Sequence, residues 1–326
     1  MLTRDAIDDA AKQIAAVAVC TPLLESPTLN RLLGGRILVK AEMLQRTGSF
    51  KFRGAYNHIS RISGGDRARG VVALSSGNHA QAVASAANLC GITARVVMPA
   101  GAPEVKVART RSLGAEVISF KGSRDELEAF AFELAEKNGS IMVHPFNDFL
   151  IMAGQGTIGA EIAQQCAALN VAPDTVLVPC SGGGLVAGIA TALESSLPAA
   201  EIFAVEPEGF DDTRRSLLAG ERLANEPGAP SICDALLVPR PGELTFAINR
   251  CRLAGAFAIP DEESEKAMTA LFSHLRLVAE PGGAIALAAC TSGAYACSGR
   301  TIVVVVSGGN VDSARFAAAI SRHGDT

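Results

Sequence analysis

The feature that most constrains the fold is the alternation of short apolar, β-branched runs with longer amphipathic segments along nearly the whole chain. Runs such as 36–41 and 301–306 carry Val and Ile without polar alternation, which is typical of strands covered on both faces. The intervening segments, among them 78–89 and 124–138, have the spacing of helices that would supply this cover. The pattern predicts an α/β fold with open, mainly parallel sheets. A closed barrel would need a more regular repeat than the chain has.

The length of 326 residues exceeds what one compact core usually holds, so two closely associated domains are expected. Further strands are predicted at 70–74, 93–98, 116–120, 140–143, 176–179 and 202–205. Further helices are predicted at 156–168, 262–274 and 283–290. In open parallel sheets, ligands bind where loops leave the carboxyl ends of the strands. Three glycine-bearing loops lie at such positions, and they carry most of the functional information.

Composition excludes several classes of function. The 29 basic and 33 acidic residues give a net charge of -4, which argues against a nucleic-acid partner because phosphate binding needs a concentrated basic surface. No apolar run approaches the roughly 18 residues that cross a bilayer, so no membrane association is expected. The N-terminal residues lack the basic and apolar regions of a signal peptide, and the eight cysteines form no Cys-x-x-Cys pair. A cytoplasmic protein is therefore expected.

The first segment that could carry chemistry is Ser-Phe-Lys-Phe-Arg-Gly-Ala at 49–55. Lys51 stands between Phe50 and Phe52. A lysine desolvated by such neighbours has a pKa below about 10.4 and presents a nucleophilic amine. The alternative is a lysine at a helix start whose ammonium group reaches outward into water. The residues alone leave both interpretations open.

Three further segments each join the end of a strand to a turn. Ser-Ser-Gly-Asn-His at 75–79 is either a capping turn or a site for a small carboxylate at a helix start. Ser-Gly-Gly-Gly at 181–184 exposes backbone N–H groups that suit a phosphate, although a tight structural turn is the alternative. This loop lacks the spacing of a P-loop or a dinucleotide-binding turn. Ser307 ends a strand, where its hydroxyl either caps the strand or faces the same crevice.

Taken together and in this order, the four segments resemble the fold type II pyridoxal phosphate enzymes, specifically the serine/threonine dehydratase and serine racemase family. The similarity runs from about residue 21 to the C-terminus. It implies two open-sheet α/β domains of the tryptophan synthase β-like kind, with the cofactor in the cleft between them. The large, cofactor-binding domain would comprise 1–53 and 147–326, and the small, mobile domain 54–146.

The resemblance also implies roles for individual residues. Lys51 would be the Schiff-base lysine and general base, and Ser76 a second acid or base on the opposite face of the substrate. Ser307 would face the ring nitrogen. Pyridoxal 5'-phosphate would be held by Phe50, Lys51, Asn78, Ser181, Gly182, Gly183, Gly184, Leu185 and Ser307. The carboxylate of a small amino-acid substrate would be held by Ser75, Ser76, Gly77, Asn78 and His79.

The activity implied is that of a pyridoxal phosphate-dependent ammonia-lyase. It would eliminate water from a β-hydroxy-α-amino acid of the serine, threonine or 3-hydroxyaspartate type, giving a 2-oxo acid and ammonia. A neutral hydroxyl at the ring nitrogen stabilises a carbanion less than a carboxylate does, which suits elimination better than transamination. The alternative is an amino-acid racemase with elimination as a side activity. A β-replacement enzyme and a catalytically silent binding protein fit the motifs less well.

A further acidic segment follows another predicted strand. Glu206 and Asp212, together with the carbonyl of Phe210, match the divalent cation site of racemase-like family members. Oxygen ligands of this kind suit Mg²⁺ or Ca²⁺. The alternative is an acidic loop in which Asp211 or Asp212 caps a helix. A homodimer is expected from the resemblance alone.

Overall fold

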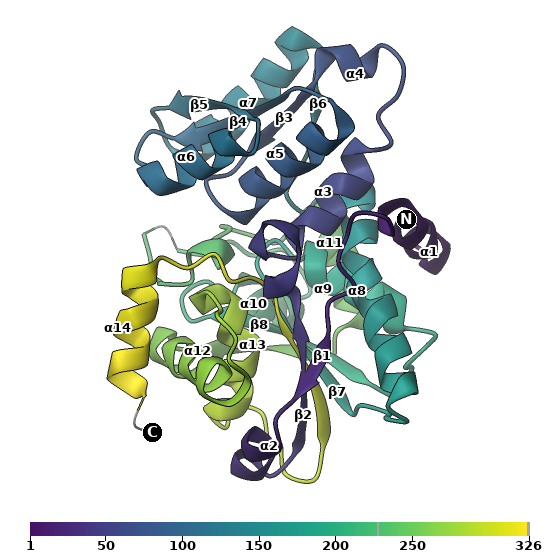
Figure 1. Cartoon of the computed structure of the whole chain (residues 1–326), viewed down its shortest axis with the longest axis vertical. Coiled ribbons are helices and arrows are strands. Elements are labelled where there is room, and N and C mark those ends of the chain that lie inside the picture. Colours follow the sequence, from purple (N-terminus) through teal and green to yellow (C-terminus); the bar gives the residue numbers. More distant parts are fainter. Residues whose placement is uncertain (227, 325–326) are drawn as a thin grey trace.

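The computed structural model describes residues 1–226 and 228–324. Two β-sheets, each covered by helices, lie one above the other (Figure 1). The chain begins beside the lower sheet, passes through the whole upper sheet and then returns to complete the lower one. The predicted α/β class with open sheets is confirmed.

The lower sheet has six strands in the order β1-β2-β10-β7-β8-β9. These are β1 (Leu23–Glu25), β2 (Arg36–Ala41), β7 (Thr175–Pro179), β8 (Glu201–Pro207), β9 (Gly255–Ile259) and β10 (Thr301–Val306). All neighbouring strands are parallel except β1, which runs antiparallel to β2. Residues 302–306 of β10 have no exposed surface, as expected for an apolar strand near the centre of a sheet covered on both faces.

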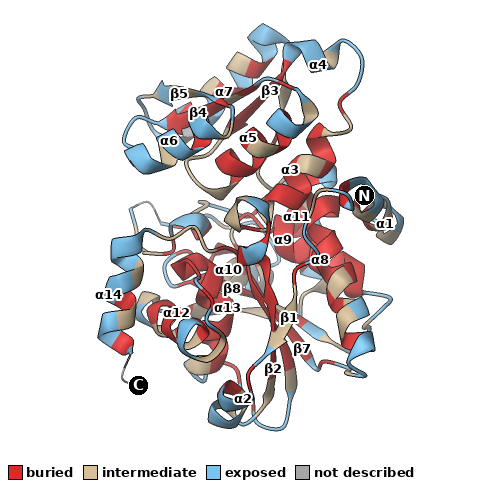
Figure 2. Ribbon diagram, viewed as in Figure 1, coloured by how far each residue is buried: buried red, intermediate tan, exposed pale blue. Residues whose placement is uncertain are grey.

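Helices cover both faces of this sheet. Val303 and Val305 of β10 face a core that α8 and α9 complete, whereas Ile302 and Val304 face a core built with α12 and α13. The helices around the lower sheet are α1 (Arg4–Ile14), α2 (Pro27–Leu33), α8 (Phe149–Ala168), α9 (Gly184–Leu193), α10 (Asp212–Ala219), α11 (Glu243–Arg252), α12 (Asp261–Leu275), α13 (Pro281–Thr291) and α14 (Ser313–His323). Figure 2 shows that α8, α9 and α13 are buried along most of their length.

The upper sheet has four parallel strands in the order β5-β4-β3-β6. These are β3 (Val71–Leu74), β4 (Ala94–Pro99), β5 (Glu116–Phe120) and β6 (Ile141–Met142). Its helices are α3 (Lys51–Ile59), α4 (Asp66–Arg69), α5 (Asn78–Cys90), α6 (Glu104–Ser112) and α7 (Arg124–Asn138). Alternate residues of β3 face opposite cores: Val71 contacts the core that includes α5, and Val72 the core that includes α7.

The two sheets are joined at α3, which packs against both α5 of the upper layer and α8 of the lower one. Close packing there depends on small residues, because a Cβ atom at Gly154 of α8 would lie 2.5 Å from the Cα atom of Gly54 in α3. Short 3-10 turns complete the chain, at η1 (Glu42–Leu44), η2 (Arg46–Gly48) and η3 (Asp234–Leu236).

The eight strands predicted from the sequence are all present, with ends displaced by at most two residues. The prediction missed β1 and β9. The helix predicted at 156–168 begins earlier, at Phe149, because the Asp148 side chain caps it by accepting from the N–H of Ile151.

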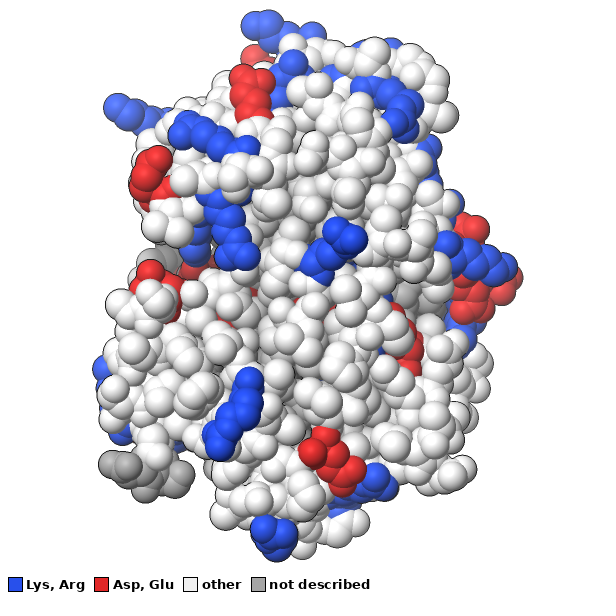
Figure 3. All heavy atoms as spheres, viewed as in Figure 1, with Lys and Arg blue, Asp and Glu red and all other residues white. Residues whose placement is uncertain are grey.

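The last two features of the fold are the apolar length of its helices and the distribution of charge on its surface. Among the described residues, no helix is both long and apolar enough to span a lipid bilayer. On the face drawn in Figure 3, basic and acidic side chains are interspersed, with uncharged residues between them.

Candidate active site

Lys51 is the first residue of α3, and its amine points to the backbone of a distant segment. Nζ donates a hydrogen bond to the carbonyl oxygen of Pro145 at 2.7 Å and lies 5.1 Å from the centroid of the Phe50 ring. Burial lowers the pKa of Lys51 to about 8. A substantial fraction of the amine is therefore unprotonated and nucleophilic near neutral pH.

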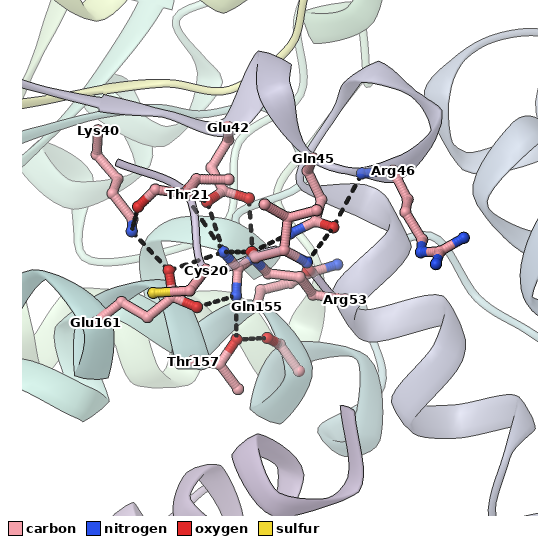
Figure 4. Close-up of polar contacts among 12 residues, drawn as sticks. Cys20, Thr21, Lys40, Glu42, Gln45, Arg46, Arg53, Gln155, Thr157 and Glu161 are labelled. Carbon is pink, nitrogen blue, oxygen red and sulfur yellow. Dashed lines mark hydrogen bonds and ion pairs between the residues drawn. The ribbon is translucent and has the colours of Figure 1, made fainter. Parts of the chain in front are cut away.

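A buried ionic network fixes the start of α3 (Figure 4). The Arg53 guanidinium donates to both carboxylate oxygens of Glu42, each at 2.8 Å, and to Glu161 at 2.6 Å. Lys40 donates to the other oxygen of Glu161, also at 2.6 Å. The side chains of Lys40, Glu42 and Arg53 are almost completely buried. Because η1 and α8 both hold Arg53, the neighbouring Lys51 occupies a rigidly defined position.

The loop 181–184 follows β7 and leads directly into α9. Gly183 has φ = +88°, and a Cβ atom there would lie 2.7 Å from Asn249 Nδ2. A Cβ atom at Gly182 would lie 2.4 Å from ring atoms of Phe146. Glycine is therefore required in this loop. The N–H groups in the first turn of α9, where Leu185 lies, have no acceptor within the helix, so this turn is suited to bind an anion.

One short segment joins the amine to the glycine loop. Pro145 accepts the Lys51 hydrogen bond, and the next residue, Phe146, packs its ring against Gly182 and its backbone against Gly184. The Lys51 amine and the candidate phosphate loop thus both contact the dipeptide Pro145-Phe146. Close packing against Phe146 also explains why glycines occupy this loop. The tight-turn interpretation and the phosphate interpretation are therefore compatible.

The loop 75–79 connects β3 to α5. Ser75 Oγ accepts from the N–H of Gly77 at 3.1 Å, and Ser76 lies beside it, partly buried. The His79 ring is within 2.8 Å of the carbonyl of Val143. Burial, assisted by the charge of Lys51, lowers the pKa of His79 to about 3, so its ring is neutral at physiological pH.

Asn78, at the start of α5, bonds to two residues of the lower layer. Its Nδ2 donates to Glu280 Oε1 at 2.6 Å, and its Oδ1 accepts from Asn310 Nδ2 at 2.7 Å. Glu280 precedes α13, and Asn310 follows β10. Sequence reasoning missed both partners.

Ser307 directly follows β10 and is almost completely buried. Its carbonyl accepts from the N–H of Phe50 at 3.1 Å, and the next residue, Gly308, pairs with Ser49. The backbone around Ser307 is therefore hydrogen-bonded to the segment that carries Lys51. The structure brings together all four segments that the sequence singled out.

The predicted cation site follows β8. Glu206 is buried, and its carboxylate accepts from the backbone N–H groups of Thr213 and Arg214 at 3.0 and 2.9 Å. Glu206 therefore caps the first turn of α10, a role that the alternative interpretation of the sequence gave to Asp211 or Asp212. Burial and the neighbouring Asp212 carboxylate raise the pKa of Glu206.

Asp212 carries the observation that favours a cation. Burial raises the pKa of its carboxyl to about 7, and its Oδ2 is buried without a hydrogen-bond partner, while Oδ1 accepts from Asn225. Two buried acids with one unpartnered oxygen fit a hard divalent ion. Within the described residues, no cluster of three or more His, Cys, Asp or Glu side chains could hold a metal. Such a site therefore depends on the carbonyl of Phe210.

Comparison with known proteins places the chain in a family. Residues 15–308 match the model of a family described as pyridoxal-phosphate dependent enzymes. The chain belongs to this family. Its site fits the cofactor: an amine with a lowered pKa is available for the aldehyde, and the glycine loop leads into a helix start whose first N–H groups have no side-chain cap and suit the phosphate.

The similar proteins include enzymes of known reaction. The L-threonine ammonia-lyase of Thermotoga maritima is 41% identical over 312 residues, which cover 96% of this chain and 76% of the relative. The L-threo-3-hydroxyaspartate ammonia-lyase of Saccharomyces cerevisiae is 38% identical, covering 96% and 94%. The structure of maize serine racemase has a TM-score of 0.91 and 34% identity, covering 99% of this chain and 98% of that one. The family resemblance predicted from the sequence is confirmed.

Proposed function

We propose that this pyridoxal-phosphate dependent enzyme is an ammonia-lyase that eliminates water from a β-hydroxy-α-amino acid, giving a 2-oxo acid and ammonia. Serine, threonine and 3-hydroxyaspartate are the substrates to test. The observation that carries the proposal is the Lys51 amine, desolvated and fixed on Pro145, beside the glycine loop. The two ammonia-lyases at 41% and 38% identity support the reaction class.

The residues assigned to the cofactor come from three loops and the start of α3. Ser181, Gly182, Gly183, Gly184 and Leu185 hold the phosphate through backbone N–H groups. Phe50 packs beside the ring, Asn78 donates to the ring hydroxyl, Ser307 faces the ring nitrogen, and Lys51 reaches the aldehyde. When bound, pyridoxal phosphate supplies the aldehyde that takes up the amino group and the ring that withdraws electrons from Cα.

The protein's own groups carry the proton transfers and the orientation. Lys51 removes the Cα proton, because a base with a pKa of about 8 is partly free at neutral pH. Backbone and side-chain donors of loop 75–79 hold the substrate carboxylate at the start of α5. His79 in this loop is neutral and adds no positive charge. The hydroxyl leaves from Cβ with a proton, which completes the loss of water. The released enamine tautomerises to an imine, and hydrolysis of the imine by water gives the 2-oxo acid and ammonia.

A racemase is the second candidate, and the similarity to maize serine racemase favours it. Inversion needs an acid or base on the face of Cα opposite Lys51. Ser76 is the proposed group, because its hydroxyl lies in the loop that takes the substrate carboxylate.

The remaining expectations stay proposals. A large domain of residues 1–53 and 147–326 and a small, mobile domain of residues 54–146 would enclose the substrate and exclude water. Mg²⁺ or Ca²⁺ would bind Glu206, Asp212 and the carbonyl of Phe210. A homodimer, a cytoplasmic location and the lack of a nucleic-acid or membrane partner remain predictions.

The decisive experiment is a panel of β-hydroxy amino acids of both configurations, assayed for ammonia, 2-oxo acid and inverted product. The wild type should release ammonia and 2-oxo acid in equal amounts. Lys51→Ala should lose more than about a thousandfold in turnover, because it removes both the aldehyde-binding amine and the base. Ser76→Ala should lose inversion and retain elimination. Inverted product without ammonia would favour the racemase, and full turnover by Lys51→Ala would refute the assignment of the base.

A further inference from the structure

A partly buried chain of side-chain hydrogen bonds crosses from the upper layer to the lower one. Asn78 donates to Glu280 Oε1 at 2.6 Å and accepts from Asn310 Nδ2 at 2.7 Å. Asn310 Nδ2 also donates to the carbonyl oxygen of Thr47 at 2.7 Å. Glu280 is 4% exposed and immediately precedes α13. The proposed function uses Asn78 and leaves the other members without a role.

The chain of bonds fixes which way the Asn78 amide faces. The Thr47 carbonyl can only accept, so the Asn310 atom that contacts it must be the amide nitrogen. The same nitrogen contacts Asn78, whose facing atom must therefore be the oxygen. The Asn78 nitrogen then faces Glu280, whose carboxylate accepts from it. The assignment follows from one backbone carbonyl and one carboxylate.

Glu280 joins Asn78 to the backbone next to Ser307, two of the residues proposed for the cofactor ring. Its backbone N–H donates to the carbonyl of Gly308 at 3.1 Å, directly after Ser307. A Cβ atom at Gly308 would lie 2.3 Å from Glu280 Oε1 and 3.2 Å from Asn78 Nδ2. The carboxyl group thus packs against the backbone next to Ser307 while it holds Asn78.

The position of Glu280 disfavours the ionised form of its carboxyl group. Burial raises the pKa of Glu280 to about 7, although the hydrogen bond from Asn78 lowers it. A glutamate kept in such a place is a candidate for a functional role, because perturbed groups gather at functional sites.

We propose that Glu280 is a positioning residue for the cofactor ring, acting through the orientation of the Asn78 amide. The Asn78 nitrogen carries two hydrogens: one bonds to Glu280, and the other is left to donate to the ring hydroxyl oxygen. Without Glu280 the amide loses the acceptor that holds this nitrogen in place, and the site loses a fixed donor. The inference rests on the proposed function, which places Asn78 at the cofactor.

The test measures cofactor binding directly. Apoproteins of the wild type, Glu280→Ala, Glu280→Gln and Asn310→Ala are titrated with pyridoxal 5'-phosphate, and Kd is taken from the visible absorbance. The ratio of the two absorbance bands that report protonation of the bound ring hydroxyl is recorded as well. Glu265→Ala is the matched control, because Glu265 is also buried (9% exposed) but pairs with Arg322 on α14. Thermal unfolding of each apoprotein shows which variants fold.

Glu280→Ala should bind the cofactor about 10- to 100-fold more weakly, because the buried acceptor that holds the Asn78 amide is lost, and its band ratio should change. Glu280→Gln should recover Kd to within about threefold, because its amide oxygen still accepts from Asn78. Asn310→Ala should also weaken cofactor binding. If Glu280→Ala does not fold, Asn310→Ala takes its place as the test. Glu265→Ala should leave both Kd and the band ratio unchanged.

Two outcomes would overturn the inference: Glu280→Ala binding within twofold of the wild type, or Glu280→Gln binding as weakly as Glu280→Ala. Failure of the proposed function has a different signature. In that case the wild type itself would form no borohydride-reducible bond between Lys51 and the cofactor.

Discussion

At the scale of single residues, the pKa of the Lys51 amine is the property on which the chemistry depends. Its partly buried amine contacts Pro145 and the Phe50 ring, and burial lowers the pKa of Lys51 to about 8. A positively charged neighbour is not needed to explain the shift, because burial alone disfavours the ammonium form.

The first residue-scale prediction concerns pH. Below pH 8 the Lys51 amine is increasingly protonated and cannot attack an aldehyde, so cofactor uptake by the apoprotein should slow about tenfold per pH unit. Above pH 8 the rate should level off. The measurement is the initial rate of uptake by the apoprotein between pH 6 and 11. A midpoint near 10.5 would show that the amine is not desolvated.

The single residues of the site were also what could be predicted best from the sequence. Lys51 between two phenylalanines, the three successive glycines and the strand-end Ser307 are local patterns, each readable within a few positions. Glu280 and Asn310 could not be found in this way. They lie 202 and 232 positions from Asn78, and only the fold brings them to it.

At the scale of elements, α3 is held by charge rather than by apolar contact alone. Arg53 lies two residues after Lys51 and satisfies Glu42 and Glu161 together. Removing one member of a buried network leaves the others uncompensated, which is far more costly than losing an exposed pair.

The element-scale prediction follows from this contrast. Arg53→Leu should lower the free energy of unfolding of the apoprotein by about 3–5 kcal/mol, because it leaves Glu42 buried without its ion-pair partner and Glu161 with Lys40 alone. The matched control is Arg36→Leu, which breaks an exposed pair with Glu25 and should cost about 1 kcal/mol or less. Denaturant unfolding compares the two variants. Equal losses would mean that the network does not stabilise the start of α3.

The elements that sequence patterns missed are those with the weakest strand signal. β1 has only three residues, and β9 begins Gly-Ala, residues with low strand propensity, at the edge of the sheet. Both form because a neighbouring strand offers an edge to pair with. The central strands were predicted because burial on both faces demands a continuous apolar run, which a sequence displays directly.

At the scale of the whole molecule, the loop after β8 is the place where a bound ion would add stability. Glu206 and Asp212 face one another in a buried position, and Asp212 Oδ2 has no hydrogen-bond partner. A cation that binds only the folded protein stabilises it by mass action.

The prediction is that Mg²⁺ or Ca²⁺ at 100 times its Kd raises the free energy of unfolding by about 2.7 kcal/mol. Thermal unfolding in the presence of each ion, and after treatment with a chelator, measures the effect as a shift in Tm. Glu206→Gln should abolish the shift, whereas Glu208→Gln, an exposed acid in the same loop, should retain it. If neither ion changes the Tm of the wild type, the proposed cation site is wrong.

The path of the chain between its two layers has one more consequence. The polypeptide crosses upward after α3 and downward before α8, and the Lys51–Pro145 hydrogen bond ties these two crossings together. A hinged body moves least at its pivot. In the proposed movement of the small domain the nucleophile would stay near the axis, so reopening for each turnover would leave the reacting nitrogen almost stationary.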